Sequence, residues 1–276
     1  MKKVIVHGGK AHRDEFMSVG LACHAGLINE TTPIERRDPT DEEILDPDVL
    51  VLDVGGILDP GKGNYDHHQL PRGTEECALS LLAKAHKVPG ENDGTYHDLL
   101  KDRPWYQATV VLDAMGPFEL ARREGLKKLP EGSWSPVEKV CLEWFEQDPA
   151  GALPLAIRVM KSRIDQAIRA RDAILELSRV ASVMQVGDLQ VLRVDGADPE
   201  FFEGLIKHLN ADPAVTVSND DRGPGLALFR RNDHPGVDFS RLEGLECVEF
   251  AHRGGFIAKT RSLEDDWQDL VARATV

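Results

Sequence analysis

The sequence predicts a two-domain α/β protein whose N-terminal part is an open, mostly parallel sheet with flanking helices. Short apolar runs alternate with helical patterns over residues 3–56, in the order that parallel sheets show. The run "VLVL" at residues 49–52 is apolar throughout, as in strands that are covered on both faces. After about residue 185 the pattern changes to short strands around one helix, which predicts a smaller C-terminal domain of α/β or α+β type.

The first elements follow from apolar periodicity. Residues 3–6 are mostly β-branched and stop at His7 and two glycines, which predicts a buried strand. Residues 13–28 have apolar side chains at helical spacing, and Asp14 and Glu15 lie where carboxylates suit the positive end of a helix. The elements expected next are a strand at 32–37, a helix at 39–45, a strand at 48–56 and a helix at 74–87.

The middle of the chain is predicted to be helical. Helices are expected within residues 95–125, interrupted at Pro104 and near Pro117, and again over 135–147. A long amphipathic helix from Leu155 to about Val183 is interpreted as a core helix that joins two lobes. The elements expected after it are strands at 189–194, 214–219, 226–231 and 255–260 and a helix at 199–209.

Charge and cysteine content argue against several classes of protein. The chain has 276 residues and a net charge of −14 at pH 7, whereas binding a long duplex needs clustered Lys and Arg. Its four cysteines form no Cys-x-x-Cys pair, which argues against a thiolate zinc site. No apolar run approaches the ~18 residues of a membrane span. We expect a cytoplasmic protein that binds neither membranes nor long duplexes, with a homo-oligomer left open.

Side chains that bind metals follow the predicted strands. They are His7, His12, Asp14, Asp53, Asp66, His67 and His68. Ligands of open α/β sheets bind at the carboxyl ends of the strands, so these groups are expected at one edge of the sheet. Carboxylates and imidazoles without a thiolate suit Mn²⁺ or Mg²⁺ and tolerate Zn²⁺. One carboxylate can bridge two such ions ~3.5–4 Å apart, the arrangement of two-metal phosphoryl chemistry.

Each of these residues, taken alone, also has a structural interpretation. A histidine at a strand end, an aspartate in the first turn of a helix and an aspartate before two glycines are all common without a metal. Their occurrence together, in this order after successive strands, favours a metal site.

The motifs resemble a known family. An Asp-His-His triplet preceded by a strand-ending aspartate is typical of the DHH phosphoesterase superfamily. Within this superfamily, the chain closely resembles the melanocyte-proliferating-gene family of predicted metal-dependent hydrolases. The motifs of that family are, in order, His-x-Gly-x-Phe-His-x-Asp-Glu, Arg-Asp-Pro, Asp-Val-Gly-Gly and Tyr-Asp-His-His-Gln. This chain has "HGGKAHRDE", "RRDP", "LDVGG" and "YDHHQ". The resemblance is strong over residues 4–70, thin over 75–240, and returns weakly at "FAHRGGFIAKT".

The resemblance implies a set of metal ligands. His7 and His12 correspond to ligands of a first ion, and Asp14 and His67 to ligands of a second. Asp53 corresponds to the carboxylate that bridges the two ions, and the ions themselves are expected to be Mn²⁺, with Mg²⁺ as the alternative.

The superfamily also takes a ligand from a later helix. Asp113 in "TVVLDAMGP" is the best match, with Asp98 and Asp102 as alternatives. Asp66 would orient a neighbouring ligand. His68 would face the substrate phosphate, as a hydrogen-bond donor or as the acid that protonates the leaving oxygen.

A substrate loop is implied in the C-terminal part. His252, Arg253, Gly254 and Gly255 resemble the loop whose amides and cation receive a phosphate. The chain departs from the family at two places: Ala11 replaces an aromatic residue, which opens the pocket wall, and "AKT" replaces two glycines after "GGFI".

The function expected from these observations is hydrolysis of a nucleotide or short oligoribonucleotide phosphodiester by a hydroxide that bridges two metal ions. We expect a DHH-type metal-binding catalytic domain at 1–150, a connecting helix at 151–184 and a substrate-binding lid at 185–276. The residues expected to act in catalysis are Asp53, Asp66 and His68.

Other functions stay open at this stage. A pyrophosphatase would need several cations around the cleft, which Arg230 and Arg231 are candidates to supply, although a solvated strand end is an equal interpretation. The alternative that is not an enzyme is a regulatory protein that binds a metal or a nucleotide without catalysis. A zinc amidohydrolase is disfavoured, since the chain shows neither a His-x-His pair nor an eight-fold barrel pattern.

Overall fold

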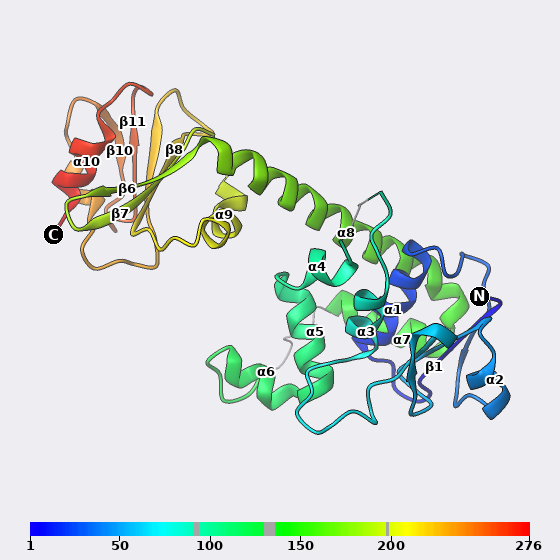
Figure 1. Cartoon of the computed structure of the whole chain (residues 1–276). Helices are drawn as coiled ribbons and strands as arrows, with labels where there is room; N and C mark the ends of the chain where they lie inside the picture. Colours follow the sequence, from blue (N-terminus) through cyan, green and yellow to red (C-terminus); the bar gives the residue numbers. More distant parts are fainter. Residues whose placement is uncertain (91–93, 130–135, 197–198) are drawn as a thin grey trace. The chain divides into compact units, whose positions relative to one another are not determined.

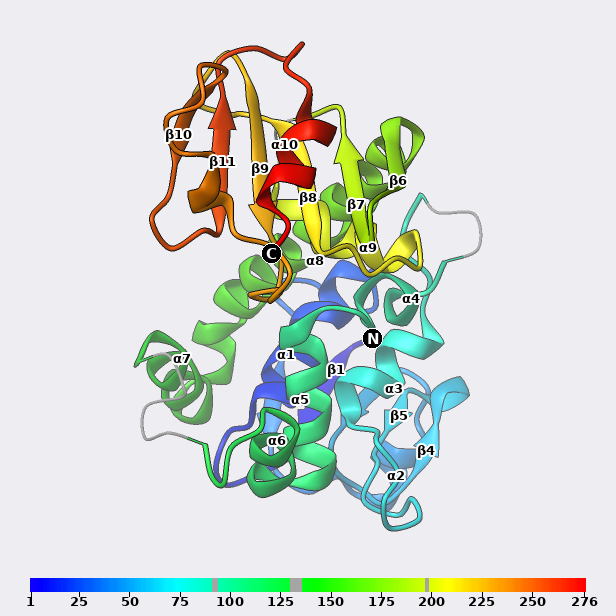
Figure 2. The same cartoon turned by 90° about the vertical axis from the view of Figure 1, so that its left-hand side faces the viewer.

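The computed structural model describes residues 1–90, 94–129, 136–196 and 199–276. These residues form two compact units, Met1–Ile168 and Arg169–Val276 (Figures 1 and 2). Both units combine helices with a mixed sheet, so the α/β fold expected from the sequence is confirmed. Among the residues described, no helix has the length and apolar character that a membrane span requires.

The first unit is built on a five-stranded sheet in the order β2-β1-β3-β5-β4. Its strands are β1 (Lys3–Val6), β2 (Ile34–Arg36), β3 (Val49–Leu52), β4 (Leu58–Asp59) and β5 (Asn64–Tyr65). All neighbouring strands are parallel except β4 and β5, which pair antiparallel. The predicted mostly parallel sheet is therefore present, and β1 and β3 are adjacent.

Alternate residues of the central strands pack on opposite faces of this sheet, as the two-residue period of a strand requires. Those packed in the main core with the helices are Val4, Val6, Leu50 and Leu52. Those in a smaller cluster are Ile5, Val49 and Val51.

Helices form the rest of the first unit. They are α1 (Arg13–His24), α2 (Asp41–Leu45), α3 (Ala78–Ala85), α4 (Tyr96–Leu100), α5 (Pro104–Met115), α6 (Pro117–Arg123), α7 (Pro136–Gln147) and the first part of α8 (Pro149–Val180), with a 3₁₀ turn at Pro60–Lys62. Pro104 and Pro117 each begin a helix, where the missing amide hydrogen is tolerated, so both expected interruptions are confirmed. Ser135, at the start of the helix expected over 135–147, lies outside the described residues.

The second unit has a six-stranded sheet in the order β10-β11-β9-β8-β7-β6. Its elements are β6 (Ala181–Val186), β7 (Leu189–Val194), α9 (Phe202–His208), β8 (Val215–Asn219), β9 (Leu226–Arg230), β10 (Val248–Ala251), β11 (Ile257–Thr260) and α10 (Trp267–Ala274), with 3₁₀ turns at Pro199–Phe201 and Phe239–Leu242. Only β7 and β8 pair in parallel. Helix α10 packs on one face of the sheet through Leu270, Val271 and Ala274 (Figure 2).

The long helix differs from its expected limits. It begins at Pro149 instead of Leu155 and ends at Val180 instead of Val183. Residues 181–183 belong to β6, because the segment pairs antiparallel with β7 across a turn at Gly187, whose φ is 58°. This pairing of strands overrides the helical pattern of the local sequence. Strand β10 and helix α10 were not among the expected elements.

Candidate metal centre

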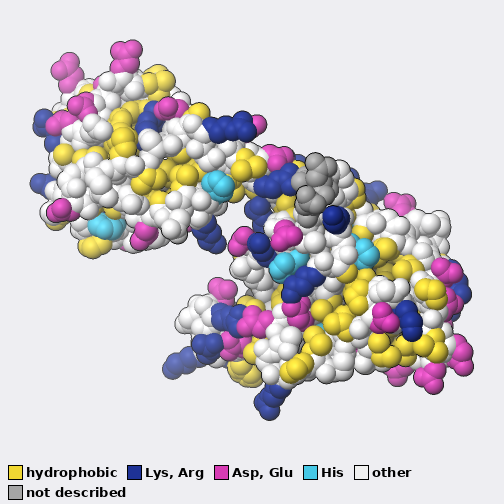
Figure 3. Space-filling view, in the orientation of Figure 1, with side chains coloured by type: hydrophobic (Ala, Val, Ile, Leu, Met, Phe, Trp, Pro, Cys, Tyr) yellow, Lys and Arg dark blue, Asp and Glu magenta, His cyan; other side chains and the backbone are white. Residues whose placement is uncertain are grey.

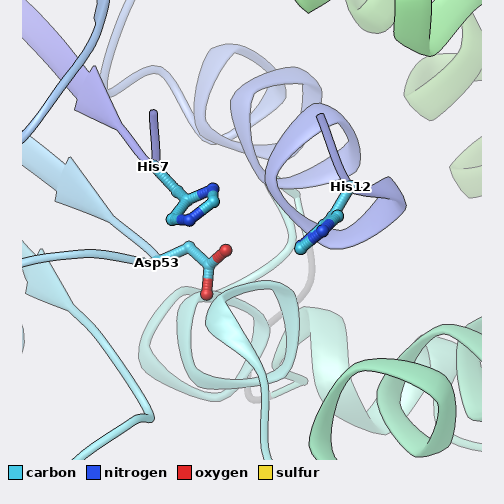
Figure 4. A group of neighbouring side chains, drawn as sticks. All are labelled: His7, His12 and Asp53. Carbon is cyan, nitrogen blue, oxygen red and sulfur yellow. The ribbon is translucent and has the colours of Figure 1, made fainter. Parts of the chain in front are cut away.

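The predicted metal ligands converge at one edge of the parallel sheet. His7 directly follows β1, Asp53 directly follows β3, and His12 is the residue before α1. Because β1 and β3 are adjacent and parallel, their carboxyl ends bring His7 and Asp53 together. Figure 4 shows the two imidazoles and the carboxylate directed into the same space.

The side chains form three overlapping groups, which together we call the His–Asp cluster. The groups are His7, His12 and Asp53; Asp53, His67 and His68; and His12, Asp14 and Asp113. Within each group, one ligand atom of every member lies within 4.8 Å of the others. Asp53 and His12 are each shared by two of the groups.

Asp53 has an unusual backbone conformation. Its φ is 60°, in the left-handed region, although it is not a glycine. Its amide donates a hydrogen bond to the Tyr65 carbonyl at 3.0 Å, which fixes the end of β3 against β5. Gly55 and Gly56 follow with φ values of 96° and 69°. A non-glycine residue held in this region costs about 1–3 kcal/mol and is typical of functional sites.

The Asp14 carboxylate is buried away from solvent. It is 1% exposed, and neither of its oxygens has a hydrogen-bond partner among the residues described. Burial, together with repulsion from Asp53 and Asp113, raises the pKa of Asp14 well above its usual value. A buried carboxylate without a partner is expensive, so a cation among these side chains fits the local electrostatics. The donor set therefore suits a divalent metal.

His67 lies between two aspartates. Its Nε2 atom is 3.2 Å from Asp53 Oδ1 and 2.9 Å from Asp113 Oδ2. Burial opposes protonation, but the nearby carboxylates of Asp113 and Asp53 outweigh it and raise the pKa of His67 to about 10. Without a metal, a protonated His67 supplies positive charge to the cluster. Only the neutral ring coordinates a metal, so metal binding would release this proton.

Asp66 holds His68 in place. One Asp66 oxygen accepts the His68 amide at 2.9 Å and lies 2.7 Å from His68 Nδ1, while the other accepts the Gly56 amide at 2.6 Å. Burial opposes ionisation of Asp66, yet the amides of His68 and Gly56 bind the carboxylate and lower its pKa. The residue that Asp66 orients is therefore His68, whose side chain is 58% exposed.

Asp113 reaches the cluster from α5, and the two alternatives do not. Asp98 binds the amide and hydroxyl of Thr95 at the start of α4. Asp102 is exposed after α4 and belongs to none of the three groups. Asp113 Oδ1 lies 3.9 Å from His12 Nδ1. Packing of α5 in the core thus selects one of three nearby aspartates.

A buried ion pair, which was not expected from the sequence, supports the loop that carries His12. Glu15 Oε1 accepts the His12 amide at 2.8 Å and a hydrogen bond from Arg36 Nη1 at 2.8 Å. Arg36 also donates to the Gly9 carbonyl at 3.1 Å. Burial raises the pKa of Glu15 to about 7, against the opposing effect of Arg36. The motifs "RDE" and "RRDP" contain both residues, but only the fold reveals that they pair.

The predicted substrate loop lies in the second unit, between β10 and β11. His252 Nδ1 accepts the Gly254 amide at 2.9 Å, so its proton is on Nε2, and the Gly255 amide donates to the His252 carbonyl. Gly255 has a φ of 66°, and an added Cβ would lie 2.1 Å from Asp238 Oδ1. The Arg253 side chain is exposed. The loop is thus a fixed turn, in a different unit from the His–Asp cluster.

Comparison with known proteins concerns the N-terminal segment. Residues 3–77 match the family model MYG1_exonuc, which describes an uncharacterised protein family (UPF0160). The chain is 35% identical over 63 residues to MYG1 protein C27H6.8 of Caenorhabditis elegans and 36% identical over 67 residues to MYG1 exonuclease of Bos taurus. These segments cover 23% and 24% of this chain, but only 18% and 17% of those relatives.

The expected resemblance to the melanocyte-proliferating-gene (MYG1) family is therefore confirmed for the segment that contains most of the His–Asp cluster. Residues 3–77 include His7, His12, Asp14, Asp53 and the Asp-His-His triplet. Asp113 and the loop at residues 252–255 lie outside the matched segment. From residue 3 to residue 77, this chain resembles the MYG1 family.

Proposed function

We propose that this protein is a metal-dependent phosphoesterase that hydrolyses a nucleotide or a short oligoribonucleotide. The observation that carries the proposal is the buried, unpaired Asp14 carboxylate within a cluster of aspartates and histidines. Such a cluster is unfavourable without a cation and favourable with one. The name of the bovine relative, MYG1 exonuclease, supports a nuclease-like hydrolase.

Oxygen and imidazole donors suit Mn²⁺ and also Mg²⁺. The residues that would hold two ions are His7, His12, Asp14, Asp53, His67 and Asp113. Two bound ions would polarise the phosphoryl group and supply the nucleophile for its hydrolysis.

His68 is suited to move a proton to the leaving oxygen. Asp66 engages its Nδ1 atom, so the ring is held with Nε2 as the atom available to substrate. A histidine whose other nitrogen is bound to a carboxylate keeps a fixed orientation. Asp66 therefore acts as a positioning residue, and His68 as the acid.

The preference for a short substrate rests on charge. The net charge is −14, and Figure 3 shows Lys and Arg side chains interspersed with Asp and Glu over the visible face. Long duplexes are bound through many basic contacts with phosphates. A short substrate needs only the metal centre and a few donors, and the exposed Arg253 side chain is proposed as one such donor.

The pyrophosphatase alternative gains no support from Arg230 and Arg231. Arg231 is 8% exposed and binds Glu203 and the Pro213 carbonyl. Arg230 donates to the carbonyls of Val237 and Gly254. Both guanidiniums already donate to protein acceptors. Arg231 is therefore neither a solvated strand end nor free to bind a phosphate.

The test is hydrolysis of a short oligoribonucleotide by the purified protein with Mn²⁺, beside Asp53→Asn. The substitution weakens both proposed metal positions, so we expect a loss of more than about a hundredfold in turnover, beyond what loss of a supporting residue costs. Circular dichroism should show an unchanged fold. Near-normal turnover in Asp53→Asn would contradict the bridging role. Tight nucleotide binding without turnover in any divalent ion would favour the regulatory alternative.

A further inference from the structure

A cavity of about 660 Å³ opens beside the His–Asp cluster within the first unit. Three cluster members, His12, Asp14 and Asp113, form part of its wall. The remaining wall comes from the loop before α1, from α5 and from α7. Its apolar part consists of Ala11, Leu112 and Leu142, and its charged part includes Lys10, Lys139 and Glu143.

We propose that this cavity binds the base of the nucleotide whose phosphate reaches the His–Asp cluster. The inference rests on the proposed function, and it assigns a binding role to α7, which no motif of the sequence indicated. It makes Leu142 a specificity-determining residue of the site.

The position of the cavity supports this assignment. Because His12, Asp14 and Asp113 belong both to the cluster and to the cavity wall, the cavity adjoins the cluster directly. Its volume falls within the ~300–1,000 Å³ of small-molecule sites, which are mainly apolar with a few polar groups. The two faces of a nucleobase are planar and apolar, and burying them against aliphatic side chains is favourable. The polar groups of the wall are available to its edge.

The wall is fixed by protein contacts. The Ala11 amide donates to Glu146 Oε2 at 3.1 Å, which connects the loop before α1 to α7. Arg13 binds Glu138, a second connection between these elements. Ala11 is 7% exposed and has no side chain beyond Cβ, so it leaves this part of the cavity open.

The experiment compares adenosine 5′-monophosphate with ribose 5-phosphate by isothermal titration calorimetry, in Mn²⁺ and again in EDTA. Both ligands carry the same phosphate and sugar, so a difference in affinity reports the base. We expect the monophosphate to bind at least about tenfold more tightly, because burial of the apolar faces of the base adds to the affinity.

Two variants test whether the base binds in this cavity. Leu142→Trp fills it from α7, and Glu143→Trp narrows it from a side chain that is 56% exposed and tolerates substitution. Both should reduce the affinity for adenosine 5′-monophosphate to that for ribose 5-phosphate, which itself stays unchanged. Val140→Trp adds the same side chain at a 62% exposed position of α7 that does not line the cavity, and should change neither affinity.

The outcomes separate this inference from the proposed function. Equal affinity for the two ligands in the wild type, or a base preference that survives in both folded Trp variants, would overturn the base site even if oligoribonucleotides are hydrolysed. A base preference that both variants remove would support the site even if no hydrolysis is found. Thermal unfolding of each variant identifies any that does not fold.

Discussion

The two units differ in how an aspartate with little exposure is compensated. In the second unit, the Asp220 side chain is 5% exposed and lies 2.6 Å from Lys259 Nζ. In the first unit, Glu15 is likewise paired, with Arg36, but Asp14, which is 1% exposed, has no hydrogen-bond partner in the described part of the chain. Buried charges that are paired maintain a fold, whereas an unpaired one indicates where a cation from solution is needed. This contrast is the strongest physical argument for a metal centre.

The largest effect on stability is expected from Arg36→Met. Arg36 is paired with Glu15, and their side chains are 6% and 0% exposed, so the change leaves a buried carboxylate without its partner. Breaking a buried pair costs about 3–5 kcal/mol, and the free energy of unfolding should fall by this order at pH 8, measured by denaturant titration.

At lower pH, Arg36→Met should reduce the free energy of unfolding by a smaller amount. The pKa of Glu15 is already raised to about 7 by burial, so at pH 6 a neutral Glu15 is accessible. A loss below about 1 kcal/mol at pH 8 would mean that the pair does not support the loop before α1.

Addition of Mn²⁺ should stabilise the wild-type protein. A ligand that binds only the folded state at about 100 times its dissociation constant adds about 2.7 kcal/mol. Asp14→Asn should remove this gain without destabilising the metal-free protein, because it eliminates a repelled, buried carboxylate. Thermal unfolding with Mn²⁺ and with EDTA tests both statements. An undiminished gain in Asp14→Asn would show that Asp14 holds no metal.

The matched change in the second unit is Asp220→Asn. Lys259 donates to the Asp220 carboxylate at 2.6 Å, and the Arg222 amide donates to the same oxygen at 3.2 Å. Hydrogen bonds to charged groups contribute about 1.5–3 kcal/mol, so unfolding should become easier by about 2 kcal/mol, by the same amount with Mn²⁺ and with EDTA. If the loss of stability in Asp220→Asn differs between Mn²⁺ and EDTA, the inferred difference between the two units is wrong.

A pH dependence due to His67 is also expected. Its pKa is raised from 6.5 to about 10 in the folded, metal-free protein. The stability that it contributes is therefore complete below pH 6.5 and is lost as the pH rises towards 10. In EDTA, the melting temperature of the wild type should fall more steeply over this range than that of His67→Gln. Parallel curves would mean that His67 is not protonated between Asp53 and Asp113.

Local sequence was enough to predict most members of the cluster. Strand limits near His7 and Asp53 follow from apolar runs that end in glycines, and parallel strands necessarily bring their carboxyl ends to one edge. The residue types then indicate a hard or borderline cation. These conclusions needed only periodicity and the chemistry of the side chains.

Long-range packing decided the rest. It selected Asp113 over Asp98 and Asp102, because the direction of a helical side chain depends on how the whole helix packs. It also paired Arg36 with Glu15 and engaged Arg231 with Glu203, contacts between residues 21 and 28 positions apart. Local patterns do not determine such contacts, since they form only when distant segments are brought together by a common core. The sequence by itself determined which side chains of metal-binding type lie at the strand ends, and the tertiary structure decided which charges remain unpaired there.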